Sequence, residues 1–231
     1  MKLFKRILDS LIFPSYCISC SQKRYEDNLL NLCGFCRNDL PLTNHFIIRD
    51  NLFEQRFWGR IPLYAGASLF FFQKDGFVQE LMYKVKYESA IPEAIYLGQL
   101  LGKALNQSED FQSINYLVPI PLHPRKKRKR GYNQSELLCE GIISVWKKPV
   151  FRGIKRTKNT KSQTQMGKLE RLQNLSGAME VDQVDLIEPH FLIIDDVMTT
   201  GTTIEICALA LLEKYPKAKI SAATLAFADL W

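Results

Sequence analysis

The sequence contains no run of about 18 uncharged apolar residues, the length that a membrane-spanning helix requires. Its N-terminal stretch, MKLFKRILDSLIF, is interrupted by Asp9 and Ser10 and followed by Pro14. It therefore lacks the continuous apolar region and small-residue cleavage site of a signal peptide. Its apolar residues recur instead at the spacing of a short amphipathic helix. We expect a cytoplasmic protein that does not span a membrane.

Two common nucleotide-binding signatures are missing as well. The sequence has no GxxxxGK[ST] phosphate loop, and no GxGxxG follows an apolar strand. It also has no internal repeat and no low-complexity tract. Its 231 residues, 46% apolar and 24% charged, are typical of a globular protein with one buried core and a small appendage.

Basic residues are concentrated in one part of the chain. The formal net charge is +7. Between His123 and Arg171, 15 Lys and Arg face only three acids, a balance of +12, so the remainder carries −5 (7 − 12). Such a surface suits polyanions such as phosphates, pyrophosphate or a nucleic-acid backbone. The alternative is a solvated basic segment without a ligand.

Four of the six cysteines lie close together, in the two pairs CISC and LCGFC. In a reducing compartment this pairing favours a metal over disulfides. Twelve residues between the pairs can return the chain to close a tetrahedral zinc site, and four thiolates leave no open coordination position. We therefore predict a structural zinc, with a redox CxxC or chance thiols as the alternative. The predicted ligands are Cys17, Cys20, Cys33 and Cys36.

Segments with strand and helix patterns alternate after the cysteines. Strands are predicted at 60–72, 114–122, 149–157, 191–195 and 220–228, and helices at 77–89, 94–105, 135–146 and 203–214. Ser135 is the expected N-cap of the third helix. This alternation predicts an α/β protein, with a parallel sheet and helices on both faces. The polar stretch after residue 156 shows little periodicity and is a candidate lid.

The sequence FLIIDDVMTTGTT, residues 191–203, combines an apolar strand, two acids and a threonine-rich loop. The acids fall at a strand's carboxyl end, where ligands of parallel sheets bind. Backbone N–H groups and hydroxyls of the loop, with the positive end of the following helix dipole, form an anion cradle. Carboxylates beside a phosphate suit ribose hydroxyls, with Mg²⁺ as a bridge. The predicted phosphate-binding residues are Thr199, Thr200, Gly201, Thr202 and Thr203, and the acids are Asp195 and Asp196.

The same residues are also compatible with two different roles. The acids resemble the magnesium site of a Walker B strand, although the chain has no Walker A lysine. Alternatively, the loop is only a helix N-cap beside solvated acids, because Thr and Asp favour caps.

The stretch resembles the phosphoribosyl pyrophosphate (PRPP) binding motif of type I phosphoribosyltransferases. Together with VPIPLHPRKKRKRGYNQSELL, RTKNTKSQTQMGKLERLQNLSGAM, KVKYES and the four cysteines, it is similar to the ComF family of competence-associated proteins over nearly the whole chain. The sequence departs from that family at Tyr132, where Phe is usual, and at Thr202, where Ala is common. Neither change removes a carboxylate or a hydrogen-bond donor.

The resemblance implies a type I phosphoribosyltransferase fold at 60–231, with a basic loop at 123–134 and a flexible lid at 156–178, after an amphipathic helix and zinc-finger segment at 1–45. It implies that Asp195 and Asp196 hold ribose and act as the catalytic acids. Lys86 and Tyr87 are further candidates for the pocket. The basic-loop residues implied for pyrophosphate are His123, Arg125, Arg130, Tyr132 and Asn133. The lid residues are Arg156, Lys158, Lys161, Gln163 and Arg171.

The expected function is that of a PRPP-binding protein of natural transformation that handles single-stranded DNA. The alternative is an active transferase that displaces pyrophosphate from PRPP onto an unknown nucleophile. A competence helicase or another DNA-processing protein is an expected partner. The aromatic residues available to stack on bases near the basic segment are few, namely Tyr132, Trp146 and Phe151.

Overall fold

The structure is a computed structural model, and it describes most of the chain from the first cysteine pair to Ala228. Lys129 is described by its backbone alone. The predicted N-terminal amphipathic helix and most of the predicted lid lie outside the described residues. The described ranges are 16–17, 19–22, 30, 32–88, 90–157 and 177–228.

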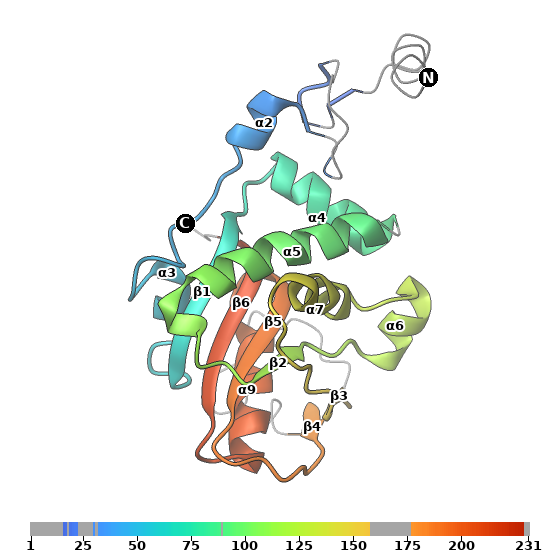
Figure 1. The fold of residues 1–231 in the computed structure, drawn as a ribbon. Helices are drawn as coiled ribbons and strands as arrows, with labels where there is room; N and C mark the ends of the chain where they lie inside the picture. The colour runs from blue at the N-terminus through green and yellow to red at the C-terminus, as the bar shows by residue number, and fades with distance from the viewer. Residues whose placement is uncertain are drawn as a thin grey trace.

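Four parallel strands form the central sheet, in the spatial order β1-β6-β5-β2 (Figure 1). This confirms the predicted parallel sheet. β5 pairs with both β6 and β2, so the strand that carries the acid pair has a neighbour on each side. The strands are β1 (Leu63–Phe71), β2 (Tyr116–Pro119), β5 (His190–Met198) and β6 (Lys219–Phe227).

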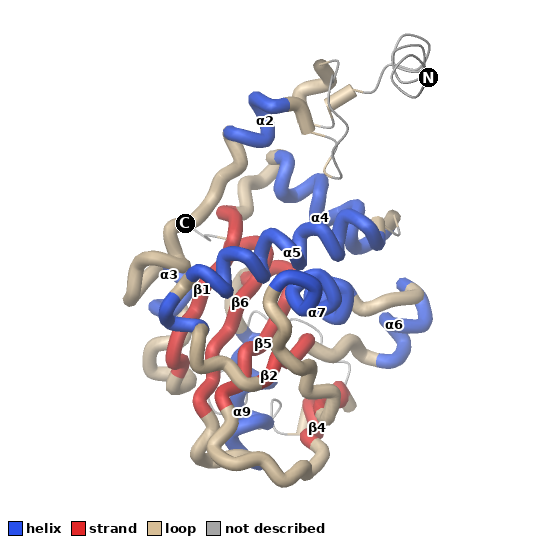
Figure 2. The backbone as a smooth tube through the Cα atoms, viewed as in Figure 1, coloured by secondary structure: helices blue, strands red, loops and turns tan. Residues whose placement is uncertain are grey.

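Side chains of β5 alternate between two hydrophobic cores, one on each face of the sheet. Leu192 and Ile194 belong to the first core, while Phe191 and Ile193 belong to the second. A fully apolar strand is what a sheet covered on both faces requires. Helices supply the cover, as Figure 2 shows. The first core is completed by α4 (Phe77–Tyr87), α5 (Ile91–Gln107) and α7 (Gln134–Val145), and the second by α3 (Leu52–Gln55) and α9 (Thr202–Lys214).

Helices α5 and α7 pack very closely at glycines. A Cβ added at Gly141 would lie 2.0 Å from the Ile95 carbonyl oxygen, and one at Gly98 would lie 2.3 Å from the Leu138 carbonyl oxygen. Neither position can hold a larger residue without a backbone shift. The close contact fixes α7 against the sheet, with the first turn of α7 next to β5.

The basic segment differs from the loop that the sequence suggested, because it contains the helix α6 (Pro124–Arg130). The Nδ1 atom of His123 accepts the Arg125 N–H at 3.2 Å, which caps the start of the helix. Pro124 occupies the first turn, and Gly131 ends the helix at a φ of 86°. Both ends thus carry ordinary helix signals, which the six consecutive like charges obscured.

The strand predicted at 149–157 is not one continuous strand of the main sheet. Val150 makes one isolated parallel bridge to Leu117 of the main sheet. The chain then enters β3 (Ile154–Arg156), which pairs antiparallel with β4 (Met179–Val181) in a separate two-stranded sheet. These two strands flank the predicted lid and bring its two ends together.

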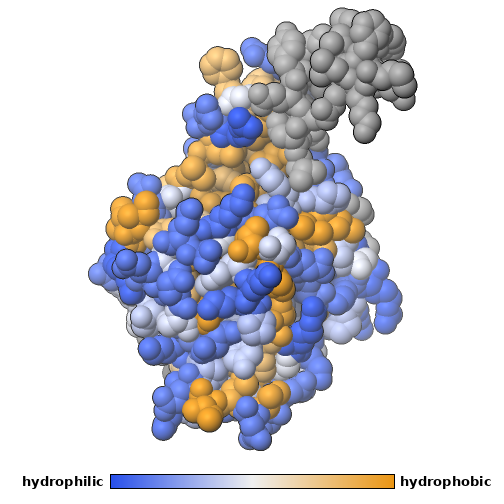
Figure 3. Space-filling model, in the orientation of Figure 1, coloured by the Kyte–Doolittle hydropathy of each residue, from blue (hydrophilic) through white to orange (hydrophobic). Residues whose placement is uncertain are grey.

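The remaining described elements are short: α2 (Gly34–Asn38) beside the cysteines and the 3-10 helix η1 (Glu109–Phe111). One face of the molecule is mainly hydrophilic, with hydrophobic residues in separate patches (Figure 3). Among the described residues, no helix is both long and apolar enough to cross a membrane.

Candidate functional site

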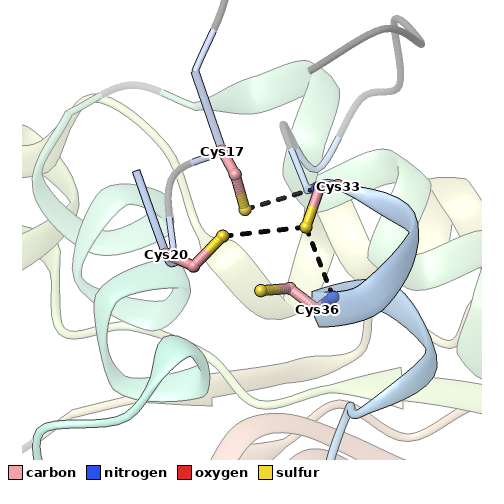
Figure 4. Close-up of side chains that lie close together, drawn as sticks. All are labelled: Cys17, Cys20, Cys33 and Cys36. Atoms are coloured by element: carbon pink, nitrogen blue, oxygen red, sulfur yellow. Dashed lines mark hydrogen bonds between the residues drawn. The ribbon is translucent and has the colours of Figure 1, made fainter. Parts of the chain in front are cut away.

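The four predicted metal ligands come together near the N-terminus. Their sulfur atoms all lie within 4.8 Å of one another, and the Cys20 and Cys33 sulfurs are 3.7 Å apart (Figure 4). A tetrahedral centre with bonds of about 2.3 Å places its sulfurs about 3.8 Å apart. The cluster can therefore hold a metal ion.

Backbone groups favour a thiolate in this cluster. Burial raises the pKa of Cys17, but hydrogen bonds to its sulfur from the backbone of Cys20, Cys33 and Ser19 outweigh burial and lower the pKa to about 6. The Cys33 N–H group lies 3.3 Å from the Cys17 sulfur. Because thiolates and not thiols bind metals, this environment prepares Cys17 as a ligand.

Asp195 and Asp196 lie on β5 near its carboxyl end. The strand does not end at the acids, as the sequence suggested, but continues to Met198, because Val197 and Met198 still pair with β6. Both acids are half-buried. They face a part of the molecule where α4, α7 and the loop before α9 meet.

Asp195 is held by two hydrogen bonds. Its Oδ1 atom accepts the Ser135 hydroxyl at 3.2 Å and the Asp196 N–H at 2.9 Å. Burial, followed by repulsion from the Asp196 carboxylate, raises the pKa of Asp195 to about 7. The Lys86 charge and the Ser135 hydrogen bond oppose this rise. Asp195 can therefore change charge near neutral pH.

Asp196 has a cationic partner. Its Oδ2 atom lies 3.1 Å from the Lys86 Nζ atom, and its Oδ1 atom accepts the Val197 N–H at 2.7 Å. Lys86 belongs to the last turn of α4. The structure thus places this predicted pocket residue directly against the acid pair.

The threonine loop forms a hollow beside Asp195. The hollow is lined by Asp195 and by residues Val197 to Ile204. Helix α9 begins at Thr202, and its first backbone bond runs from the Glu205 N–H to the Gly201 carbonyl at 2.9 Å. The N–H groups before Glu205 have no acceptor within the helix and are available to an anion.

Gly201 is required at its position for two reasons. Its φ of 75° is left-handed, and a Cβ added there would lie 2.8 Å from the Phe57 ring. A residue with a side chain would suffer both backbone strain and a clash. The loop therefore depends on glycine for its shape.

The basic-loop candidates divide into two groups. Tyr132 and Asn133 serve the fold: the Tyr132 hydroxyl donates to the Val85 carbonyl at 2.7 Å, and Asn133, which is buried, donates to the Ile120 carbonyl at 2.9 Å. His123 caps α6, while Arg125 is exposed.

Arg130 contacts α4 through its side chain. Its Nη1 atom donates to Gln134 Oε1 at 2.7 Å, and its guanidinium lies 5.5 Å from the centre of the Tyr87 ring. Tyr87 thereby connects the basic segment to the helix that carries Lys86.

Arg156 is the one residue of the predicted lid set that the structure describes. Burial lowers its pKa, and the negative charge of Asp195 opposes this effect. The end of β3 is therefore electrostatically coupled to the acid pair. The other predicted lid residues, Lys158, Lys161, Gln163 and Arg171, lie outside the described residues.

Two of the three aromatic residues expected to stack on bases are buried. Trp146 and Phe151 are buried in the two cores, and Tyr132 is half-buried. Two other aromatic residues, both tyrosines of α4, are exposed. Tyr83 and Tyr87 are 55% and 64% exposed, and their ring centres are 4.9 Å apart.

The sequence did not identify two residues that contact the site. Ser135 was expected as an N-cap, but Asn133 caps α7 and Ser135 binds Asp195 instead. Arg60 was predicted to begin a strand. It lies instead in the turn after α3, and its Nη1 atom donates to the Thr200 carbonyl at 2.8 Å. The sequence around Ser135 indicated only the start of a helix. Arg60 and Thr200 are 140 residues apart, so no local pattern could predict their contact.

Comparison with known proteins gives related chains of similar length. The chain is 36% identical to competence protein ComFC of Bacillus subtilis, over 90% of this chain and 82% of that protein. It is 30% identical to DNA utilization protein YhgH of Escherichia coli, over 85% and 83%. It is 27% identical to competence protein F of Haemophilus influenzae, over 83% and 76%. No family model matches the chain.

Proposed function

Since this chain belongs to the ComF family of competence-associated proteins, we propose that it binds PRPP and handles single-stranded DNA during natural transformation. The observation that carries the PRPP part is the position of Asp195 and Asp196 beside the hollow of the threonine loop. A phosphorylated sugar needs hydrogen-bond acceptors for its hydroxyls next to a site that accepts its phosphate.

In this proposal the two acids bind the ribose hydroxyls. Carboxylates only accept hydrogen bonds, and the 2′ and 3′ hydroxyls of ribose are adjacent donors. Lys86 orients Asp196 through their ion pair, and Ser135 orients Asp195 through its hydrogen bond. Mg²⁺ enters with PRPP, because carboxylate and phosphate oxygens are its preferred ligands.

The 5′-phosphate of PRPP would occupy the hollow. The free N–H groups at the start of α9, the threonine hydroxyls and the helix dipole all favour an anion there. Arg130 and Arg156 are the cations that we propose for the pyrophosphate, because Arg130 lies over the Tyr87 ring of α4 and the charge of Asp195 acts on Arg156.

Calorimetric titration with PRPP and Mg²⁺ tests this proposal. The native protein should bind, and Asp195→Ala/Asp196→Ala should weaken binding at least a hundredfold, because two charge-assisted contacts of about 1.5–3 kcal/mol each are lost. The matched control is Asp182→Ala/Asp185→Ala, which removes the same charge from an exposed loop. Equal affinity in the native and acid-pair variants would exclude the ribose assignment.

The DNA part of the proposal is supported by α6 and by the tyrosines of α4. Residues 125–130 are all Lys or Arg, Arg130 lies over the Tyr87 ring, and the Tyr83 ring packs against that of Tyr87. Single-stranded nucleic acids bind to surfaces that combine cations for phosphates with aromatic rings for bases. The names of the relatives, competence protein and DNA utilization protein, support the same context.

The metal part of the proposal is that the cysteine cluster holds a structural zinc. Metal analysis should find about one zinc per chain, and Cys17→Ser should lose most of it, because four thiolates complete the tetrahedron. Cys139→Ala provides the control, since Cys139 is a buried core thiol. A native protein that is folded and free of metal would contradict the zinc assignment.

An active phosphoribosyltransferase is the second candidate, and the raised pKa of Asp195 favours it. A carboxyl group with a pKa of about 7 can accept or donate a proton at neutral pH. The nucleophile would displace pyrophosphate at C1′ of PRPP. Release of pyrophosphate only in the presence of an added nucleophile would support turnover, whereas binding without release would support the binding protein.

A further inference from the structure

Arg60 makes two contacts with the phosphate loop and the helix that follows it. Its Nη1 atom donates to the Thr200 carbonyl oxygen at 2.8 Å, and its Nη2 atom pairs with the Glu205 carboxylate. Arg60 lies in the turn after α3, far from the loop in sequence. The Arg60 and Glu205 side chains are 27% and 14% exposed, so water screens this ion pair only in part, whereas the hydrogen bond to Thr200 is at the surface.

Arg60 is itself held in one position. Its Nη1 atom also donates to the Arg56 carbonyl at 2.9 Å, and its guanidinium lies 5.5 Å from the centre of the Phe57 ring. Phe57 is fully buried, and its ring occupies the space that a Cβ at Gly201 would need. Arg60 and Phe57 therefore restrict two successive residues of the loop, Thr200 and Gly201.

The contact with Thr200 determines the direction of a peptide group. In a planar trans peptide, the carbonyl of one residue and the N–H of the next point in opposite directions. Because the Thr200 carbonyl points to Arg60, the Gly201 N–H points away from Arg60. Binding the carbonyl from outside therefore prevents the peptide from turning its negative end toward an anion in the hollow.

The contact with Glu205 changes the charge near the loop. Glu205 lies in the first turn of α9, where the helix dipole would otherwise favour a bound anion. An unpaired carboxylate at that place would repel a phosphate in the hollow. Pairing with Arg60 offsets this repulsion.

We propose that Arg60 is a positioning residue for the 5′-phosphate site, acting through the Thr200 carbonyl and Glu205 and not by contact with the ligand. This inference rests on the proposed PRPP function. It extends the site to the turn after α3, which is outside the stretch 191–203.

The test compares Arg60→Met with Arg49→Met in titrations with ribose 5-phosphate and with PRPP plus Mg²⁺. Arg49 is a close match, since it pairs with Asp110 at 2.6 Å and lies over the Tyr64 ring at 5.4 Å, but it does not touch the loop. Arg60→Met should weaken both ligands by the same factor, about tenfold, which corresponds to one charge-assisted hydrogen bond. Arg49→Met should leave both affinities unchanged.

A conservative variant separates positioning from general damage to the fold. Arg60→Lys keeps a charge and donors for Thr200 or Glu205 but loses the two-armed geometry, so it should recover part of the affinity. Equal affinities of Arg60→Met and the native protein would overturn the positioning role and leave the PRPP proposal intact. Equal losses in Arg49→Met and Arg60→Met would also overturn it. A native protein that binds neither ligand would overturn the PRPP proposal, and the role of Arg60 with it.

Discussion

The threonine loop, residues 199–203, and the basic helix α6 both attract anions, but they are built in different ways. The loop is held by Phe57 and Arg60 from one side and follows a strand buried on both faces. Helix α6 is exposed over most of its length and is held by its end caps, by the exposed Lys127–Glu136 pair at 3.1 Å and by the contacts of Arg130 with Gln134 and Tyr87.

The loop and α6 therefore offer an anion different things, namely a fixed arrangement of donors in the loop and exposed charge in α6. A loop fixed by buried contacts presents its N–H groups in one arrangement, which suits a ligand of defined geometry. A row of exposed cations presents charge with little fixed geometry, which suits a polymer backbone. The two regions therefore predict different responses to mutation, salt and pH.

The first contrast compares two glycines with a left-handed φ, Gly201 in the loop and Gly131 at the end of α6. The Cβ added by Gly131→Ala lies in open space, so the substitution should lower the free energy of unfolding only by the backbone strain, about 1–2 kcal/mol. Gly201→Ala adds the clash with Phe57 and should cost roughly 1–3 kcal/mol more. Urea unfolding measures both values. Equal losses would show that the loop is not held more tightly than α6.

The second contrast concerns salt. Arg125→Gln/Lys126→Gln/Arg128→Gln removes three exposed charges from α6 and should reduce the salt dependence of single-stranded DNA binding. The slope of log K against log salt should fall by about 2, because each phosphate contact on a single strand contributes about 0.7. Fluorescence anisotropy with a labelled oligonucleotide at several salt concentrations measures this slope. An unchanged slope would exclude α6 from the DNA surface.

These two regions were not equally predictable from the sequence. The stretch 191–203 follows local rules, since an apolar run gives the strand and Thr and Gly give the turn and helix start. Those rules also located Asp195 and Asp196. Local rules failed for α6, because six like charges suggested a loop where His123, Pro124 and Gly131 specify a helix.

Contacts between distant parts of the chain were beyond the sequence. Lys86 was a candidate through the family resemblance, but its partner Asp196 was not identified. The contacts of Arg60 with Thr200 and of Ser135 with Asp195 arise from packing of α3 and α7 on opposite faces of the sheet. Trp146 and Phe151 are buried in the same two cores, whereas Tyr87 of α4 is exposed and lies against Arg130 of α6.

The third contrast is in pH dependence. The pKa of Asp195 is raised to about 7 from 3.8, so between these values the folded protein holds a proton that the unfolded chain has released. Stability should therefore fall as the pH rises through this window and level off above it.

Asp195→Asn tests that prediction because it removes the titrating charge. The variant should come close to the native protein near pH 4 and exceed its free energy of unfolding at pH 8 by roughly 3–5 kcal/mol, since one pKa unit corresponds to about 1.4 kcal/mol. Urea titrations at the two pH values measure the difference. A difference of the same size at both pH values would show that Asp195 does not titrate in this range.

The most direct test of the division between the two regions measures two ligands on two variants. PRPP with Mg²⁺ and a single-stranded oligonucleotide are each titrated against Asp195→Ala/Asp196→Ala and against Arg125→Gln/Lys126→Gln/Arg128→Gln. We predict that the acid-pair variant loses PRPP binding and keeps DNA binding, while the α6 variant keeps most PRPP binding and loses affinity for DNA. If both variants lost both ligands to the same extent, the division between a shaped phosphate site and a charged DNA surface would be wrong.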